Sequence, residues 1–277
     1  MTWRELRSRQ FWQAMLAELL GTLVLVSTVL GSSLPGPGGG PVGPLYPAVA
    51  VGAVIVALGH CFGEISGAQV NPAVTLSLLV ARRQDVPKAL LFVGVQCLGA
   101  SLATGVLYLA LPLKTTADLF VTRVPEDLNA AQALATEILC TFQMVFTIFS
   151  VEEQRRKDST EPGNIAIGLA HTAGVLLGAR FSGACMNPAR SLGPAIIMGF
   201  WENHWVRERT PSPTPDWTPH VTLCLTLSLS LSLSLSLSDW PSCRSTGSDR
   251  CWAAFWPRCA TSSCLRAARP VRSWWRV

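Results

Sequence analysis

Long apolar stretches alternate with short polar connections along this chain. Five stretches, at about residues 11–31, 46–65, 89–111, 130–151 and 163–180, approach the ~20 residues that a helix needs to cross a membrane. The first follows three arginines and has no small-residue cleavage site, which indicates a retained span and not a secretory signal. The pattern predicts an all-α polytopic membrane protein with five clear spans.

The composition supports a membrane protein. Asp, Glu, Lys and Arg make up 14% of the 277 residues, against roughly 25% in soluble domains. Between residues 10 and 63 the only formally charged side chain is Glu18, and residues 89–113 have none. These stretches argue against a soluble enzyme, a nucleic-acid-binding protein and a disordered chain. The nine cysteines do not have the distribution of a secreted disulfide framework.

Basic residues are unevenly distributed between the connections. If the amino end, residues 1–10, is cytoplasmic, the outer loop after the third span carries only Lys114 and Arg123. The positive-inside rule favours this orientation, and we expect an integral protein of the plasma membrane. Nine basic residues then lie on the cytoplasmic side: Arg4, Arg7, Arg9, Arg82, Arg83, Lys88, Arg155, Arg156 and Lys157.

The chain contains an internal repeat. Residues 66–73 read SGAQVNPA and residues 182–189 read SGACMNPA, so six of eight positions match. Glu18 and Glu137 occupy equivalent places in the first and fourth spans. The duplication divides the chain into repeat one, about 11–111, and repeat two, about 130–206. Because three spans separate equivalent points, the halves are inverted, which predicts a working site near the midplane.

Each Asn-Pro-Ala box predicts the start of a short helix, because Asn is a favoured N-cap and Pro a favoured first helical residue. The apolar pieces that belong to these helices, 73–81 and 189–200, are too short to span a membrane. Two such helices entering from opposite faces bring two positive dipole ends together, which repels cations and protons but not neutral molecules. Asn71 and Asn187 would donate to those molecules, and the carbonyls before the boxes would accept from them. The expected pore residues are Asn71, Pro72, Ala73, Asn187, Pro188 and Ala189, with lining backbone at Gly67, Ala68, Gln69, Gly183, Cys185 and Met186.

The two boxes, the glutamates of spans one and four, and Arg190 resemble the aquaporin, or major intrinsic protein, family over about residues 11–206. The resemblance implies an inverted repeat with two re-entrant half-helices. It also implies passive permeation of water across the lipid bilayer, a homotetramer with one pore per subunit, and no cofactor. Ser191 is similar to the water-type branch, because the glycerol-conducting branch carries Asp at that place.

The resemblance further implies a four-residue selectivity filter. Val51, twenty residues before Asn71, stands where the family has an aromatic residue, and Val175, twelve before Asn187, stands where it has histidine. Two valines widen the opening, so we expect urea, glycerol, ammonia or hydrogen peroxide to pass as well as water. Gln69 also replaces the usual histidine of water channels. The expected filter is Val51, Val175, Ala184 and Arg190.

Several polar side chains have two interpretations. Glu18 and Glu137 could form a proton relay, but we favour a structural role in which they bind backbone donors. His60 and Glu64 share a helix face without a third ligand, which argues against a metal site. His171 and His204 are isolated and are interpreted as packing or surface residues. No nucleophile, base and orienting group gather at one site, so an enzyme is not predicted.

The carboxyl end departs from the family. A sixth span should begin near Trp205, but residues 207–213 read RERTPSP, and residues 225–238 alternate Leu and Ser almost strictly. A CT dinucleotide repeat encodes such an alternation, so we predict that the atypical tail, 207–277, comes from a retained intron or shifted frame. Insertion of the Leu-Ser segment into the membrane is the less favoured hypothesis.

Two functions therefore remain open. The complete set of pore residues favours a water channel with a widened apolar filter. The missing sixth span favours a non-conducting subunit that lowers the activity of an intact relative. Sequencing the transcript across the Val206 codon tests the origin of the tail, and a spliced message that still encodes the Leu-Ser segment would contradict our prediction.

Overall fold

The computed structural model describes residues 3–35, 42–111, 120, 130–152 and 163–199. The chain divides into two units, Met1–Ser238 and Asp239–Val277, and every described residue lies in the first. The described part contains helices and no strand, which confirms the all-α prediction. The helices are α1 (Trp3–Leu6), α2 (Arg9–Ser32), α3 (Leu45–Ser66), α4 (Pro72–Val80), α5 (Val86–Ala110), α6 (Ala130–Glu152), α7 (Gly163–Gly178) and α8 (Pro188–Met198).

All five predicted spans form helices. α2, α3, α5 and α6 are long and apolar enough to cross a membrane. α7 has 16 residues, which is about 24 Å at the usual rise per residue. It ends before the predicted residue 180 because the chain turns towards the second box, and Ser182 N donates to Gly178 O over 3.0 Å.

Several sequence predictions fall outside the described residues. The expected sixth span near Trp205 and the tail at 207–277 are among them. So are Lys114, Arg123, residues 155–157 and His204, so the basic residues used for the orientation are only partly described.

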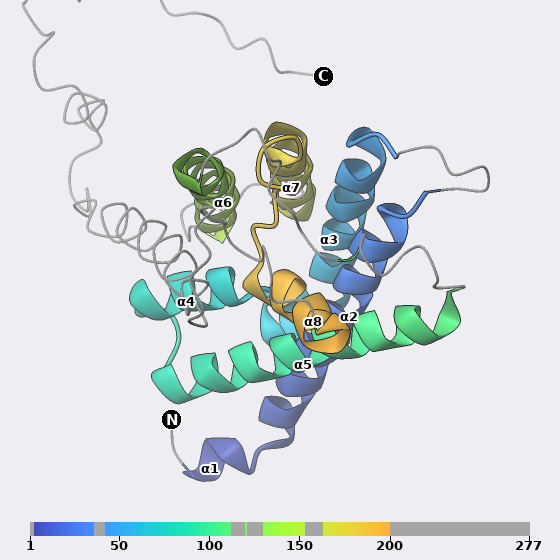
Figure 1. Ribbon diagram of the computed structural model, residues 1–277. Coiled ribbons are helices and arrows are strands. Elements are labelled where there is room, and N and C mark those ends of the chain that lie inside the picture. The colour runs from blue at the N-terminus through green and yellow to red at the C-terminus, as the bar shows by residue number, and fades with distance from the viewer. Residues whose placement is uncertain (1–2, 36–41, 112–119, 121–129, 153–162, 200–277) are drawn as a thin grey trace, which may run out of the picture. The chain divides into compact units, whose positions relative to one another are not determined.

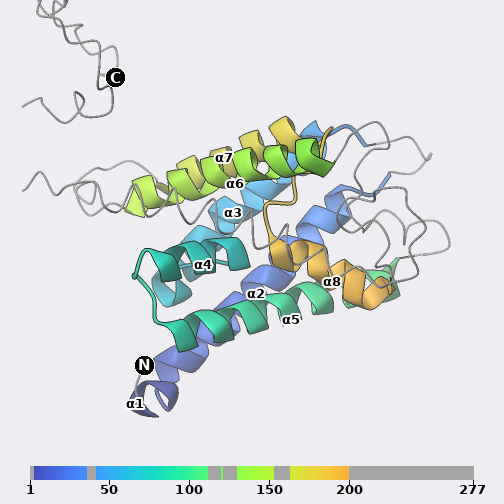
Figure 2. The same cartoon turned by 60° about the vertical axis from the view of Figure 1, so that its left-hand side comes forward.

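The helices follow the internal repeat. α2 packs against α3 in the first repeat, and α6 packs against α7 in the second. The repeats meet where α3 packs against α7 and where α5 packs against α8. Figures 1 and 2 both place the short helices α4 and α8 between the α6–α7 pair and α5. The two predicted half-helices therefore lie inside the bundle, in contact with each other.

α3 and α7 approach closely at a pair of glycines. A Cβ atom added to Gly52 would lie 2.8 Å from the carbonyl oxygen of Gly168, and one added to Gly168 would lie 2.6 Å from that of Gly52. The side-chain atoms Thr172 Oγ1 and Val56 Cγ2 obstruct the added Cβ atoms as well, but the two carbonyl oxygens belong to backbone and have little freedom to move aside. The crossing brings together Val51 and Val175, which belong to the same buried cluster.

The variant Gly52→Ala tests this crossing. We expect it to lower the stability of the detergent-solubilised protein by about 1–3 kcal/mol, because the added methyl overpacks the helix pair. Gly63→Ala is the matched control on the same helix, since nothing lies within 4 Å of its added Cβ. Thermal unfolding followed by circular dichroism makes the comparison. Equal unfolding temperatures for the two variants would contradict the close crossing.

Candidate functional site

The two segments that approach the boxes, residues 67–70 and 183–186, contain matching left-handed backbone. The residue before each box, Val70 or Met186, has a positive φ. This conformation is strained for a side chain, above all for a β-branched one, and persists only where the surroundings hold it. The positive φ angles are 93° at Gly67, 47° at Ala68, 44° at Val70, 82° at Gly183, 46° at Ala184 and 49° at Met186.

Glu18 of α2 holds the first approach. Its Oε1 atom accepts from Ser66 Oγ over 2.6 Å and from the backbone N–H of Gln69 over 2.9 Å. Its Oε2 atom accepts from the N–H of Val70 over 2.7 Å and from Gln96 Nε2 over 2.8 Å. The side chain is fully buried. Four donors therefore compensate the loss of water around this carboxylate.

Glu137 of α6 holds the second approach in the same way. Its Oε1 atom accepts from Ser182 Oγ over 2.6 Å and from the N–H of Cys185 over 2.9 Å. Its Oε2 atom accepts from the N–H of Met186 over 3.0 Å. Each glutamate thus binds the loop before its own box, which is the arrangement expected from the structural interpretation and not from a proton relay.

These bonds also orient the carbonyl groups. In a trans peptide the C=O of one residue points opposite to the N–H of the next. Because the N–H groups of Cys185 and Met186 point towards Glu137, the carbonyls of Ala184 and Cys185 point away from it. Ala184 and Cys185 line a pocket of about 320 Å³, which we call the pocket from here on. Its wall on this side therefore presents hydrogen-bond acceptors.

The box asparagines cap the half-helices as predicted. Asn71 Oδ1 accepts from the N–H of Ala73 over 2.8 Å, and Pro72 is the first residue of α4. Asn187 Oδ1 accepts from the N–H of Ala189 over 3.0 Å, and Pro188 is the first residue of α8. Both helices therefore begin at the box proline, as the capping argument predicts.

The same asparagines join the two repeats. Asn71 Nδ2 donates to the carbonyl oxygen of Met186 over 2.9 Å, and Asn187 Nδ2 donates to that of Val70 over 3.0 Å. We call this pair the reciprocal asparagine bonds. We expected both side-chain amides to donate their hydrogen bonds to the permeating molecule. In the structure, one N–H of each amide donates to a backbone carbonyl of the protein instead. Each NH₂ group retains one further hydrogen, which in Asn71 lies near the weak acceptor Met144 Sδ at 3.8 Å.

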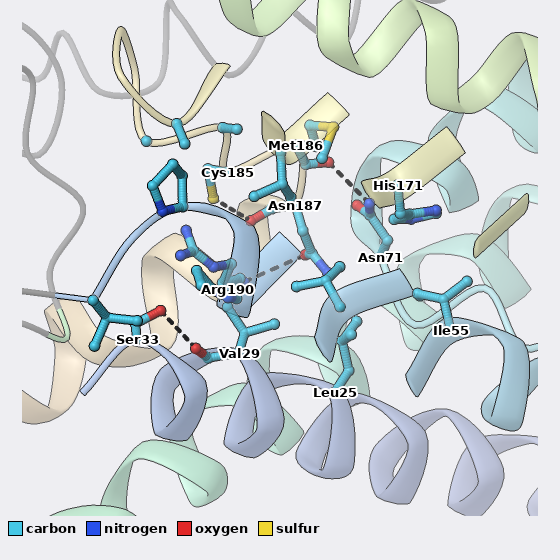
Figure 3. Close-up of a pocket in the computed structure, with 18 of the residues that line it drawn as sticks. Leu25, Val29, Ser33, Ile55, Asn71, His171, Cys185, Met186, Asn187 and Arg190 are labelled. Carbon is cyan, nitrogen blue, oxygen red and sulfur yellow. Dashed lines mark hydrogen bonds between the residues drawn. The ribbon is translucent and has the colours of Figure 1, made fainter. Parts of the chain in front are cut away.

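The pocket brings together the residues expected to form the filter. Asn71 and Asn187 line it as well, and Figure 3 shows both of them with Arg190. Gly67, Ala68 and Gln69 are not among its lining residues. The four residues expected to form the filter all lie in its wall: Val51, Val175, Ala184 and Arg190.

Two side chains near the boxes differ from their sequence interpretation. Gln69, expected to face the pore, is buried and donates from Nε2 to Gln84 Oε1 over 2.8 Å. His171, interpreted as a packing or surface residue, is buried as a packing residue would be but also lines the pocket. It lies one helical turn before Val175 on α7, and that i, i+4 spacing is the signal that could have placed it on the pore side.

Glu18→Gln tests the carboxylate support. An amide cannot accept at both ends, so at least one buried N–H would face another donor, at a cost of about 1–3 kcal/mol. We expect a lower unfolding temperature in detergent. Glu64→Gln is the control, because Glu64 is exposed on α3. If both variants unfolded at the wild-type temperature, the proposed support would be wrong.

Comparison with known proteins agrees with this geometry. The sequence profile of the major intrinsic protein family matches residues 5–211. The chain is 41% identical to human aquaporin-4 over 202 residues, which is 72% of this chain and 62% of the relative's length. It is 40% identical to rat aquaporin-2 over 73% of this chain and 74% of the relative.

The fold also matches a solved structure. The X-ray structure of the aquaglyceroporin from Plasmodium falciparum aligns with a TM-score of 0.68 and 17% identity, over 82% of this chain and 96% of that one. At this identity the match concerns the fold alone. With its apolar helices and its family match, this chain is an integral membrane protein and belongs to the major intrinsic protein family.

Proposed function

We propose that this protein is a passive water channel and that the pocket is the outer half of its pore. The reciprocal asparagine bonds carry the proposal. They bring the amino ends of α4 and α8 together at Asn71 and Asn187, which line the pocket. A lumen that passes this point offers amide donors from both repeats and carbonyl acceptors from the approach to the second box.

The electrostatics favour neutral molecules. Each half-helix contributes the equivalent of about half a positive charge at its amino end. Arg190 adds a full charge at the wall of the pocket. A cation or a proton would therefore cross a positive potential, whereas water keeps its hydrogen bonds to the wall. We extend the proposal to a homotetramer in the plasma membrane with a cytoplasmic amino end.

The filter supports a wider range of permeants. Val51, Val175 and Ala184 present apolar surface, and Arg190 provides the charged group of the set. The two valines replace a larger aromatic residue and a polar histidine of the family pattern. We therefore propose that small neutral solutes pass together with water, because diameter and lining groups set the selectivity of such pores.

Stopped-flow swelling and shrinkage of proteoliposomes tests the water channel. We expect water flux well above that of empty vesicles, and a loss of at least several-fold in Asn187→Asp. This change removes the bond to Val70 O and places a negative charge at the start of α8. Asn164→Asp, on α7 and outside the lining residues, is the control. Wild-type flux equal to that of empty vesicles would favour the non-conducting subunit.

The double variant Val51→Phe, Val175→His tests the filter. Rebuilding the family pattern should lower the permeability to urea and glycerol by about tenfold, a typical discrimination for small changes in pocket volume. Water permeability should change much less, because water is smaller than both solutes. Ala170→Val, outside the pocket lining on α7, controls for added volume. A wild-type channel that conducts water and remains tight to urea, glycerol, ammonia and hydrogen peroxide would overturn the widened filter.

A further inference from the structure

His171 has a defined hydrogen-bonding state. Its Nδ1 atom lies 2.9 Å from the carbonyl oxygen of Ile167, one turn earlier on α7. A carbonyl oxygen can only accept, so Nδ1 carries the hydrogen in this bond. In the neutral ring the other nitrogen, Nε2, then has a free lone pair and acts as an acceptor.

Nε2 is open to the pocket. The residue is 7% exposed and is among those that line the pocket. In the described part of the chain, no hydrogen bond reaches Nε2. The buried polar atoms that lack a partner there are Gln84 Nε2 and Thr141 Oγ1, so His171 Nε2 is not sealed inside protein. An accessible acceptor on a pocket-lining ring therefore faces the pocket.

The remaining polar side chains of the wall act mainly as donors. The guanidinium groups of Arg180 and Arg190 have no acceptor atoms. The Oδ1 atoms of Asn71 and Asn187 are used in capping their helices, and one N–H of each amide binds a backbone carbonyl. The second N–H of each amide is left for the pocket, in Asn71 in competition with the weak acceptor Met144 Sδ. His171 Nε2 therefore adds a ring-nitrogen acceptor to a wall whose other acceptors are backbone carbonyls and the hydroxyl oxygen of Ser33.

The position of His171 Nε2 relative to Asn71 determines which molecules can bind to both residues. Figure 3 shows His171 and Asn71 on the same side of the pocket. An N–H donor and a ring-nitrogen acceptor are complementary to a molecule that carries both a carbonyl oxygen and N–H groups. Small amides such as urea have this pattern in a rigid planar form. A polyol such as glycerol must also lose internal rotations to make two defined bonds.

We propose that His171 is a specificity-determining residue of the pore, whose Nε2 accepts a hydrogen bond from the permeating molecule and favours small amides over polyols. The proposal rests on the water-channel function proposed above. The family pattern places a histidine at the position of Val175, in the filter. Here the imidazole of His171 lies one turn before Val175 along α7. The hydrogen bond that selects between solutes is therefore made beside the wide apolar opening and not within it.

The test compares urea and glycerol permeability in proteoliposomes of the full chain. His171→Leu removes the acceptor at similar volume, and we expect its ratio of urea to glycerol permeability to fall about fivefold, the effect of one net hydrogen bond. His171→Gln keeps an acceptor and should retain most of the wild-type ratio. His60→Leu is the control, because His60 lies outside the pocket lining. A purely steric role for His171 would change both solutes together and leave the ratio unchanged.

Water flux in the same vesicles separates the two proposals. An unchanged ratio in a His171→Leu protein that still conducts water would overturn the role of His171 alone. Absence of water flux in the wild-type protein would overturn the channel itself. If His171→Leu loses water flux, His171→Val provides the same comparison with a smaller side chain. A ratio of urea to glycerol permeability that does not fall in His171→Val would then overturn the proposal.

Discussion

The site depends on buried carboxylates that bind backbone N–H groups. Glu18 and Glu137 each accept from two consecutive N–H groups of the segment before a box and from the serine that precedes this segment. Left-handed residues in these segments are unfavourable by themselves, with a typical cost of about 1–3 kcal/mol each. Charge-assisted hydrogen bonds inside a low-dielectric interior are strong enough to offset that cost. Without these hydrogen bonds, the left-handed backbone of the two segments would not be stable at membrane depth.

Everything else in the site follows from the shape of the approaches. Because the N–H groups of Cys185 and Met186 point towards Glu137, the carbonyls of Ala184 and Cys185 point away from it, and both residues line the pocket. The carbonyls of Val70 and Met186 are placed to receive the amide groups of Asn187 and Asn71. The half-helices then start at the same point from opposite directions. The close packing of α3 on α7 brings Val51 and Val175, the valines of the proposed filter, to the same pocket.

Much of this arrangement could be predicted from the sequence. The box asparagines have a strong local preference to cap a helix, and a duplicated motif with an odd number of spans implies an inverted pair. A glutamate in an apolar span needs donors, and the strained loops supply them. The i, i+4 spacing of His171 and Val175 indicates that both lie on one side of α7. The reciprocal asparagine bonds could not be predicted in this way. They depend on which side chains meet across the two repeats, and a single local pattern does not contain that information. The end of α7 at Gly178 depends likewise on where the next loop turns.

The central claim is that two positive half-helix ends, joined by the reciprocal asparagine bonds, form a pathway for water that excludes protons. The most direct test records osmotic shrinkage and an internal pH dye in the same proteoliposomes, under an osmotic gradient and a proton gradient in turn. The account predicts water permeability well above that of empty vesicles, with proton leakage equal to theirs. Proton flux that rises with the amount of protein would contradict it.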